Sequence, residues 1–167
     1  MSQDPQKAVT PPGISVRPAI EDDVAEIVRI EQAVHVAPWR AENVLAELAK
    51  PYARFLIFTD DETDSKAAAY ICYWVMFEEC NILNVAVDLP FRRQGLAKQL
   101  VHLVVREALR GGIKKILLDV RKSNQPALEL YQGLRFAITH IRKGFYSDGE
   151  DAYQMSLSVN EETLVDF

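Results

Sequence analysis

Near the middle of the chain, a basic turn joins an apolar stretch to an amphipathic helix pattern. Residues 84–89 alternate as a strand does, a proline-marked turn follows, and Gly95 stands where the helical pattern begins. Unpaired backbone N–H groups and the positive end of the helix dipole favour an anion at such a place. Arg92, Arg93 and Lys98 add positive charge around it. These residue types predict a site for a phosphorylated ligand.

A second interpretation of this turn stays open, in which it is an ordinary basic helix start with Gly95 kept for packing. The turn also differs from a nucleotide P-loop, because no Gly-Lys-Ser/Thr follows the glycine. The wider sequence context therefore has to decide which ligand, if any, the turn binds.

The length of 167 residues fits one globular domain with a sizeable core. We expect a flexible lead over residues 1–13, one folded domain over 14–159 and a short tail over 160–167. No stretch reaches the length of a transmembrane helix, and the polar N-terminus lacks an apolar signal core. We therefore expect a cytoplasmic protein that does not enter a membrane.

Charge and cysteine content exclude several classes of function. A formal net charge of −5 argues against general nucleic-acid binding and fits a basic protein partner better. Cys72 and Cys80 have neither metal-ligand spacing nor a disulfide-rich setting, so we interpret them as buried reduced thiols without a catalytic role. No metal site is predicted, and the oligomeric state is left open.

The hydrophobic patterns predict an α/β protein with a mixed sheet of about seven strands and helices on both faces. The expected strands are 14–17, 54–59, 67–77, 81–87, 114–121, 135–141 and 151–158. The expected helices are 22–35, 41–50, 93–110 and one that begins near Asn124. A strand, a helix and a strand in the middle imply that 81–87 and 114–121 are parallel neighbours.

With these elements in place, the chain resembles the GNAT superfamily of N-acetyltransferases, and within it the RimI-type protein N-terminal acetyltransferases. The superfamily's cofactor motif, Gln/Arg-x-x-Gly-x-Gly/Ala, stands here at 92–97, directly after the expected strand and before the expected helix. Further segments agree with the RimI-like group in order and spacing: 35–39, 83–88, 118–124, 130–136, 145–146 and 149–152. The resemblance covers nearly the whole folded chain.

The resemblance implies acetyl-coenzyme A as the ligand of the basic turn. In the superfamily the strand before the motif splays from its parallel neighbour, and its free backbone groups pair with the pantetheine arm. The positions implied in cofactor binding are Val85, Ala86, Val87, Arg92, Arg93, Gln94, Gly95, Leu96, Ala97, Lys98 and Asn124. From the residues alone, Val85 and Val87 read only as buried strand, and Asn124 reads equally well as a helix cap.

Acetyl transfer needs an unprotonated amine and a proton for the departing thiolate. Tyr131 matches the family's general acid, because a phenol beside the sulfur donates as charge develops there. Asp119 stands where RimI-like enzymes carry a Glu proposed as general base, and it is one methylene shorter. Alternation places it on the less apolar face of its strand. The alternatives are an aromatic anchor for Tyr131 and an ion pair with Arg121 or another cation for Asp119.

A second departure lies in 130–136, where relatives have Leu-Gly-Phe and this chain has Leu134, Arg135 and Phe136, with a glycine at 133 instead. A shifted helix end is one expected consequence, and it would move Tyr131.

On the acceptor side, the resemblance places the peptide between the loop after the first helix and the last hairpin, and thereby implicates Trp39 and Tyr146. Asp148, Glu150 and Asp151 could attract a basic N-terminal tail, or they form a solvated turn. The leading hypothesis is acetylation of the N-terminal Ala of a small-subunit ribosomal protein. The alternatives are a lysine or small-amine acetyltransferase and a non-catalytic acetyl-coenzyme A-binding module.

Overall fold

The computed structural model describes residues 10–63 and 66–164. The strands are β1 (Ile14–Pro18), β2 (Ala53–Asp60), β3 (Lys66–Met76), β4 (Glu79–Val87), β5 (Lys115–Arg121), β6 (Ala137–Arg142) and β7 (Ala152–Ser158). The helices are α1 (Val24–Val34), α2 (Ala41–Leu48), α3 (Leu96–Arg110) and α4 (Gln125–Gly133), with short 3-10 turns η1 (Glu21–Asp23), η2 (Leu89–Phe91) and η3 (Glu161–Leu164). The predicted order of strands and α-helices is confirmed.

The strands in the described part of the chain form one seven-stranded sheet with the order β1-β2-β3-β4-β5-β7-β6. β4 and β5 run parallel, whereas β5 with β7, β6 with β7 and β1 with β2 are antiparallel. The predicted mixed sheet and its parallel pair are therefore confirmed. The pairing of β4 with β5 runs from Glu79 and Lys115 to Ile82 and Leu118, so it uses only the first half of β4.

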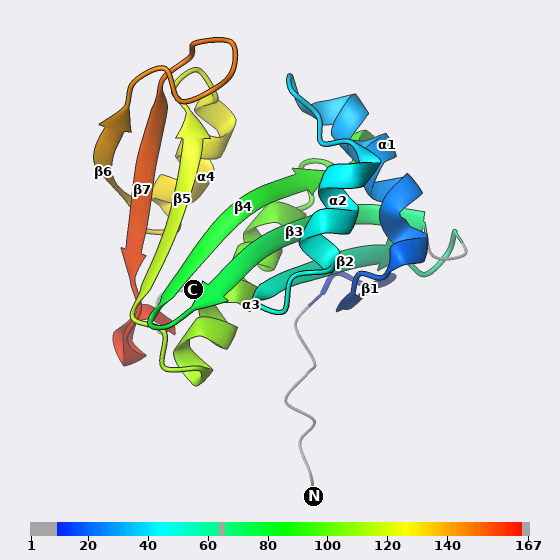
Figure 1. Cartoon of the computed structure of the whole chain (residues 1–167). Helices are drawn as coiled ribbons and strands as arrows, with labels where there is room; N and C mark the ends of the chain where they lie inside the picture. The colour runs from blue at the N-terminus through cyan, green and yellow to red at the C-terminus, as the bar shows by residue number, and fades with distance from the viewer. Residues whose placement is uncertain (1–9, 64–65, 165–167) are drawn as a thin grey trace, which may run out of the picture. The chain divides into compact units, whose positions relative to one another are not determined.

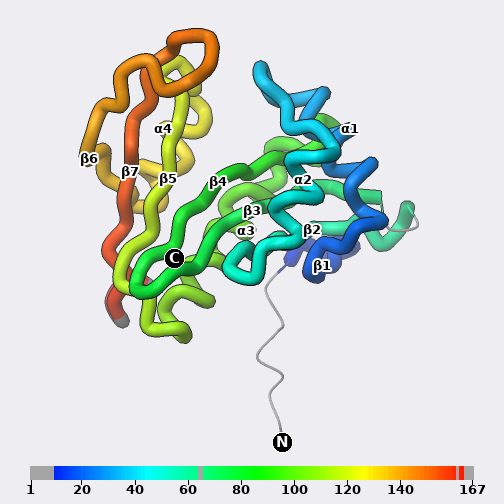
Figure 2. The backbone as a smooth tube through the Cα atoms, in the orientation of Figure 1, coloured from blue at the N-terminus to red at the C-terminus, as the bar shows by residue number. Residues whose placement is uncertain are grey.

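The chain divides into two compact units, and each is built from two separate stretches of sequence. Unit 1 comprises residues up to 73 together with 84–103, and unit 2 comprises 74–83 together with the residues from 104 onward. In unit 1, α1 and α2 lie on one face of β2 and β3, and the first turns of α3 lie on the opposite face (Figures 1 and 2). In unit 2, α4 lies against β5 and β7 (Figure 1).

Each unit has its own apolar core, because each buries the apolar side of its strands under a helix. The largest fully buried side chains of unit 1 include Ile27, Ile30, Ile57, Phe58, Tyr70, Ile71, Leu96 and Leu100. Those of unit 2 include Ile116 and Met155, with Val104, Val105 and Val120 beside them in the buried set. Along β5, Ile116, Leu118 and Val120 alternate with more exposed residues, as the sequence predicts.

Several element boundaries differ from the prediction by one or more residues, and two of these differences have a conformational cause. α3 begins at Leu96 rather than near 93, because Arg93 (φ 65°) and Gly95 (φ 77°) adopt left-handed backbone conformations that a helix cannot include. β6 begins at Ala137 rather than 135, because Arg135 (φ 64°) ends the preceding helix in the same conformation. Both differences lie next to predicted site residues.

The structure describes only parts of the two chain ends. Of the predicted flexible lead, residues 1–9 lie outside the described residues, and the predicted tail is described up to 164. There it forms η3, in which Thr163 is buried and its hydroxyl donates to the Ser158 carbonyl at 3.2 Å. Among the described helices, none combines the length and hydropathy needed to cross a membrane.

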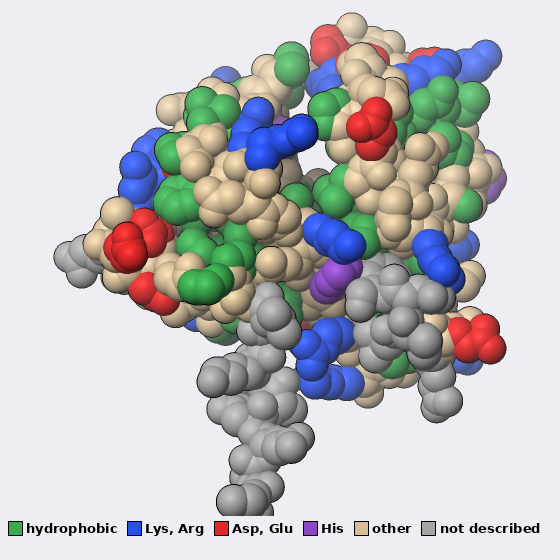
Figure 3. Space-filling model, turned by 180° about the vertical axis from the view of Figure 1, so that it is seen from behind, with side chains coloured by type: hydrophobic (Ala, Val, Ile, Leu, Met, Phe, Trp, Pro, Cys, Tyr) green, Lys and Arg blue, Asp and Glu red, His purple; other side chains and the backbone are tan. Residues whose placement is uncertain are grey.

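The distribution of surface charge agrees with the net charge of the chain. On the face shown in Figure 3, Lys and Arg side chains lie in separate groups among apolar and acidic ones rather than in one continuous basic surface.

Candidate active site

The basic turn in unit 1 leaves backbone donors pointing out of the start of α3. The first helical hydrogen bond there runs from the Gln99 N–H to the Gly95 carbonyl at 3.1 Å. The N–H groups before it have no carbonyl one turn back to donate to. Within the described residues, no backbone acceptor is recorded for the N–H groups of 93–98. The predicted phosphate site therefore has the backbone geometry that binding of an anion requires.

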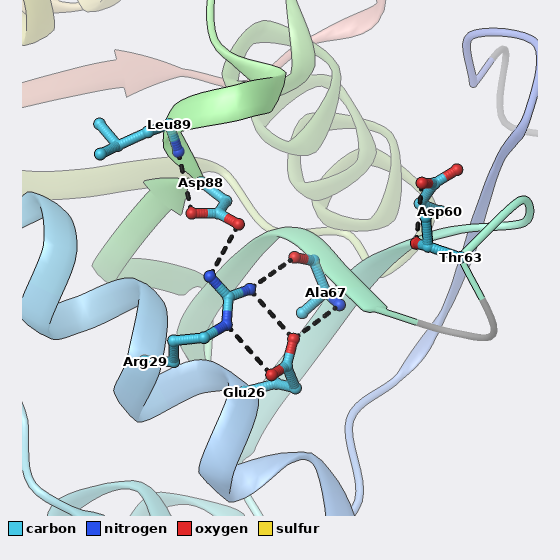
Figure 4. A network of polar contacts seen from close by, with 7 residues as sticks. All are labelled: Glu26, Arg29, Asp60, Thr63, Ala67, Asp88 and Leu89. Atoms are coloured by element: carbon cyan, nitrogen blue, oxygen red, sulfur yellow. Dashed lines mark hydrogen bonds and ion pairs between the residues drawn. The ribbon is translucent and has the colours of Figure 1, made fainter.

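A buried carboxylate fixes the entry to this turn. Asp88 is 2% exposed, and its side chain accepts a hydrogen bond from the Leu89 N–H at 2.9 Å, which caps η2. Its other oxygen accepts from Arg29 Nη1 of α1 at 2.8 Å. Figure 4 shows that Arg29 also reaches Glu26 and the Ala67 carbonyl at the start of β3. One guanidinium thus ties α1, β3 and the turn together.

The strand that precedes the turn presents the pattern expected of a half-covered strand. Ala86 is buried, whereas Val85 and Val87 on the other side of β4 are only half-buried. The loop after α1 carries Trp39, whose backbone N–H donates to Glu31 Oε2 at 2.7 Å. Glu31 is fully buried, and its second oxygen accepts from the Asn84 side chain at 2.7 Å. In unit 1, the predicted cofactor strand and the predicted acceptor loop are therefore joined through one carboxylate.

In unit 2, Asp119 lies on the half-exposed face of β5, as predicted. Its Oδ2 accepts from Arg142 Nη1 of β6 at 2.7 Å. Its Oδ1 is buried, and within the described residues it has no hydrogen-bond partner. The sequence left an ion pair with Arg121 or another cation open, and the cation is Arg142. One oxygen of the carboxylate remains available as an acceptor.

Tyr131 lies in the last turn of α4, and the end of that helix is well defined. The Phe136 N–H donates to the Tyr131 carbonyl and the Arg135 N–H to the Gln132 carbonyl, both at 2.9 Å. With Arg135 in the left-handed conformation, this is the Schellman arrangement in which glycine usually occupies that place. The helix therefore ends in a regular Schellman geometry with Arg135 at the position that favours glycine.

The environment of Tyr131 suits a proton donor. Its ring packs edge-on against Phe136, with the centroids 5.6 Å apart. Burial raises the pKa of the Tyr131 phenol well above its ordinary value, and the nearby Tyr146 raises it further. The phenol is therefore protonated at neutral pH, which is the state that a general acid must have.

The hairpin between β6 and β7 carries Tyr146 next to a network of ion pairs. The Arg121 guanidinium stacks 4.0 Å from the Tyr146 ring centroid and forms ion pairs with Asp148 and Glu150, both at 2.8 Å. The acidic side chains that could attract a basic peptide are thus paired within the chain. Burial raises the pKa of Tyr146, and the charge of Asp119 acts on it in the same direction.

Two further predicted residues have structural roles. Asn124 caps α4, because its side-chain oxygen accepts from the Ala127 N–H at 3.2 Å. A cap does not conflict with cofactor contact, so the implied role of Asn124 stays a prediction. Cys72 and Cys80 are buried thiols, and burial raises the pKa of Cys80 to about 12 and that of Cys72 further. Neither therefore supplies a thiolate nucleophile at neutral pH.

The structure brings the predicted residues together in two sets. Unit 1 holds Trp39, residues 85–87 and residues 92–98, and unit 2 holds Asp119, Asn124, Tyr131 and Tyr146. Three further residues position these segments without being predicted to do so from the sequence: Arg29, Glu31 and Asp88. A signal for Glu31 was present, since it is the charged member of the apolar helix face that carries Ile27 and Ile30.

The structure is that of an α/β protein with a mixed sheet, in which a basic glycine turn precedes a long helix. Comparison with known families gives the particular family. The model of the acetyltransferase (GNAT) family matches residues 24–136, so the chain belongs to this family. It is accordingly an N-acetyltransferase that uses acetyl-coenzyme A as the acetyl donor.

Individual relatives narrow the comparison. The chain is 32% identical over 142 residues to the putative ribosomal protein bS18-alanine N-acetyltransferase of Bacillus subtilis, covering 84% of this chain and 92% of that protein. It is 32% identical over 141 residues to the ribosomal protein bS18-alanine N-acetyltransferase of Escherichia coli, covering 83% and 93%. These relatives bear out the resemblance to the RimI-type group.

Solved structures support the fold. The crystal structure of the Escherichia coli ribosomal-protein-S18-alanine N-acetyltransferase matches with a TM-score of 0.79 and 29% identity, covering 88% of this chain and 94% of that one. Ard1 from Thermoplasma volcanium matches with a TM-score of 0.80 and 25% identity, covering 89% and 99%. Arabidopsis thaliana NAA60 in complex with acetyl-CoA, at 18% identity and a TM-score of 0.78, shares the fold and covers 88% and 99%.

Proposed function

We propose that this protein acetylates the N-terminal alanine of ribosomal protein bS18 in the cytoplasm. The observation that carries the proposal is the similarity to two bS18-alanine N-acetyltransferases over more than four fifths of the chain. That alignment length takes in both the donor-binding and the acid–base residues named above. The acceptor is a primary amine at the end of a flexible chain, which a direct transfer can use without a covalent enzyme intermediate.

The donor is held mainly by the backbone of unit 1. The N–H groups at the start of α3 bind the pyrophosphate, and Arg92, Arg93 and Lys98 add charge that favours the same anion. The backbone of β4 at Val85 and Val87 pairs with the amide-bearing arm of the donor. Trp39, after α1, and Tyr146, in the hairpin of unit 2, contact the acceptor peptide.

The proton transfers belong to residues of unit 2. Asp119 takes a proton from the acceptor ammonium, directly or through one water bound at its unpaired Oδ1. The free amine attacks the thioester carbon, a C–N bond forms, and the C–S bond breaks. Tyr131 gives its phenolic proton to the departing thiolate. The nitrogen of the new C–N bond then loses its surplus proton to the Tyr131 phenolate, and Asp119 releases its own proton to solvent. The products are an N-acetylated peptide, free coenzyme A and one proton.

A peptide experiment tests this function directly. The protein is incubated with acetyl-coenzyme A and a peptide that carries the bS18 N-terminus beginning with Ala, and mass spectrometry locates the acetyl group. The expected product carries it on the N-terminal amine. The control peptide is already acetylated at its N-terminus and keeps free internal lysines. Acetylation of that control at lysine, or of neither peptide, would contradict the proposal.

A further inference from the structure

Glu31 is a fully buried carboxylate that no step of the proposed mechanism uses. It lies in the last turn of α1, among the apolar side chains of unit 1. Burying a carboxylate costs several kcal/mol unless good hydrogen bonds compensate, and an apolar side chain of similar size would avoid the cost. The hydrogen bonds of Glu31 therefore indicate which segments this buried carboxylate holds in place.

Its two oxygens reach two different segments of unit 1. Oε2 accepts from the Trp39 backbone N–H and Oε1 from Asn84 Nδ2, both at 2.7 Å. Such distances are at the short end expected for charge-assisted bonds. The remaining contact is with His35 Nε2, at 3.5 Å from Oε1. The carboxylate therefore bridges the 35–40 loop and β4 from inside the helix.

The bridge joins the acceptor side of the unit to the strand that binds the donor. Asn84 directly precedes Val85, while Trp39 lies in the loop assigned to the acceptor peptide. In the segment that precedes α2, Val36 is 81% exposed and Pro38 is also exposed, whereas the Arg40 N–H at its end donates to Asn43 Oδ1 at 2.9 Å. Between this exposed stretch and the start of α2, the Trp39 backbone N–H is bound by the buried Glu31 carboxylate.

We propose that Glu31 is a positioning residue that holds the Trp39 loop in register with β4, and thereby sets the affinity for the acceptor amine. This inference rests on the proposed function for the role of Trp39. The proposed role of Glu31 concerns the binding of the acceptor peptide. We therefore expect no direct effect of Glu31 on donor binding or on the proton transfers.

Replacing Glu31 with Leu removes both acceptor oxygens and keeps much of the volume. The Trp39 N–H and the Asn84 amide then lose their partner, and the loop is released. We expect the KM for the acceptor peptide to rise about tenfold, as for loss of a hydrogen bond to a charged group, while the KM for acetyl-coenzyme A stays within about twofold. An equal rise in both KM values would indicate a general loss of structure and overturn the inference.

A swap of the two side chains gives a test that does not depend on how well Glu31→Leu folds. Asn84→Asp alone sets two carboxylates against each other at a hydrogen-bonding distance and is expected to raise the acceptor KM. Adding Glu31→Gln restores a donor opposite Asp, while the Gln oxygen still accepts from the Trp39 N–H. The double variant should therefore recover the acceptor KM. Failure to recover it would contradict a specific bridge.

The loop can also be observed without any acceptor. The chain has two tryptophans, so Trp74→Phe leaves Trp39 as the sole indole. In this background, Glu31→Leu should increase acrylamide quenching of Trp39 fluorescence, and the Gln–Asp pair should reverse the increase. Unchanged quenching would overturn the inference. If the wild type acetylates no N-terminal peptide, the proposed function fails, yet the quenching result still decides whether Glu31 holds the loop.

Discussion

The two units use polar side chains in opposite ways. In unit 1, the carboxylates of Glu31 and Asp88 are almost fully buried and bind mostly backbone N–H groups and single side chains of neighbouring segments. In unit 2, the carboxylates of Asp119 and Asp148 are partly exposed and pair with arginines across the end of the sheet. The first arrangement fixes the backbone, and the second leaves charged groups in contact with solvent.

The difference follows from what each set must do. A site made of backbone donors works only if the backbone is held rigidly, and a buried charge with fixed partners does that at a cost in desolvation. Proton transfer instead needs titratable side chains placed at the reacting atoms. Breaking an ion pair in unit 1 should therefore cost more stability than breaking one in unit 2, whereas removing the proposed acid or base of unit 2 should mainly affect turnover.

The largest effect is expected for Tyr131→Phe in unit 2. The variant removes the phenolic proton and keeps the ring that packs on Phe136. A general acid contributes roughly 100- to 10,000-fold, so kcat should fall at least about 100-fold. Acetyl-coenzyme A binding by calorimetry and the unfolding temperature should match the wild type. Because burial raises the pKa of Tyr131, loss of its proton should not limit wild-type kcat from neutral pH up to the ordinary pKa of tyrosine; a drop in that range assigned to Tyr131 would contradict its role.

Asp119→Asn is expected to have the next largest effect, a loss of about 100-fold in kcat with intact donor binding. The matched control is Arg142→Met, which breaks the same ion pair and leaves the carboxylate in place. If Asp119 is the base, the control loses only a small part of kcat. Equal losses in both variants would mean that the ion pair, not the proton transfer, is what Asp119 provides.

Asp88→Ala tests the buried arrangement in unit 1. It removes the cap of η2 and leaves Arg29 without one partner, although Glu26 remains. Loss of a partner in a buried pair costs about 3–5 kcal/mol, and the partial exposure of Arg29 reduces this to roughly 2 kcal/mol. Arg142→Met in unit 2 should cost only about 0.5 kcal/mol. Urea unfolding at low and high salt measures both, and a comparable cost would remove the contrast between the units.

Arg135→Gly should stabilise the protein by about 1 kcal/mol, because a left-handed conformation costs a non-glycine residue about that much. Gly133→Ala is the companion change, since a Cβ there meets no atom within 4 Å and Ala favours a helix. The two changes together move the glycine from 133 to 135. A drop in the unfolding temperature of Arg135→Gly would show that the arginine side chain contributes more than the conformation costs.

The smallest effect concerns pH, where the two units should respond with opposite signs. Hydrogen bonds from Ser123 and Arg121 lower the pKa of Glu150 to about 2, so its contribution is present above the ordinary carboxyl pKa and is lost as pH falls toward 2. Burial raises the pKa of Glu31, so the folded state holds the Glu31 proton more tightly than the unfolded state does. The gain in free energy of unfolding from this proton is present below the ordinary carboxyl pKa and is lost as pH rises through the raised value. Glu150→Gln and Glu31→Gln should each remove one limb of the pH dependence of unfolding. Identical pH profiles for the two variants would contradict this assignment.

The sequence predicted the element order and the parallel pair because apolar periodicity and the proline and glycine punctuation agree over most of the chain. It could not predict which cation pairs with Asp119, since Arg142 comes from another strand 23 residues away. It also could not predict that Arg135 adopts the left-handed conformation, because propensity favours glycine there. The role of Glu31 could not be predicted, because a single charged residue on an apolar helix face has no evident function in the sequence until its hydrogen-bond partners are known.

The division of the chain into units made of two stretches each has a consequence for synthesis. A ribosome delivers β1 to β3 and the two helices beside them early, but unit 1 lacks the end of β4 and the first turns of α3 until residue 103 has emerged. Unit 2 is completed later, because the 74–83 hairpin is synthesised well before β5 and β7, which are parts of the same unit. The backbone proposed to bind the donor can thus be assembled on the nascent chain before the residues proposed for proton transfer have emerged from the ribosome.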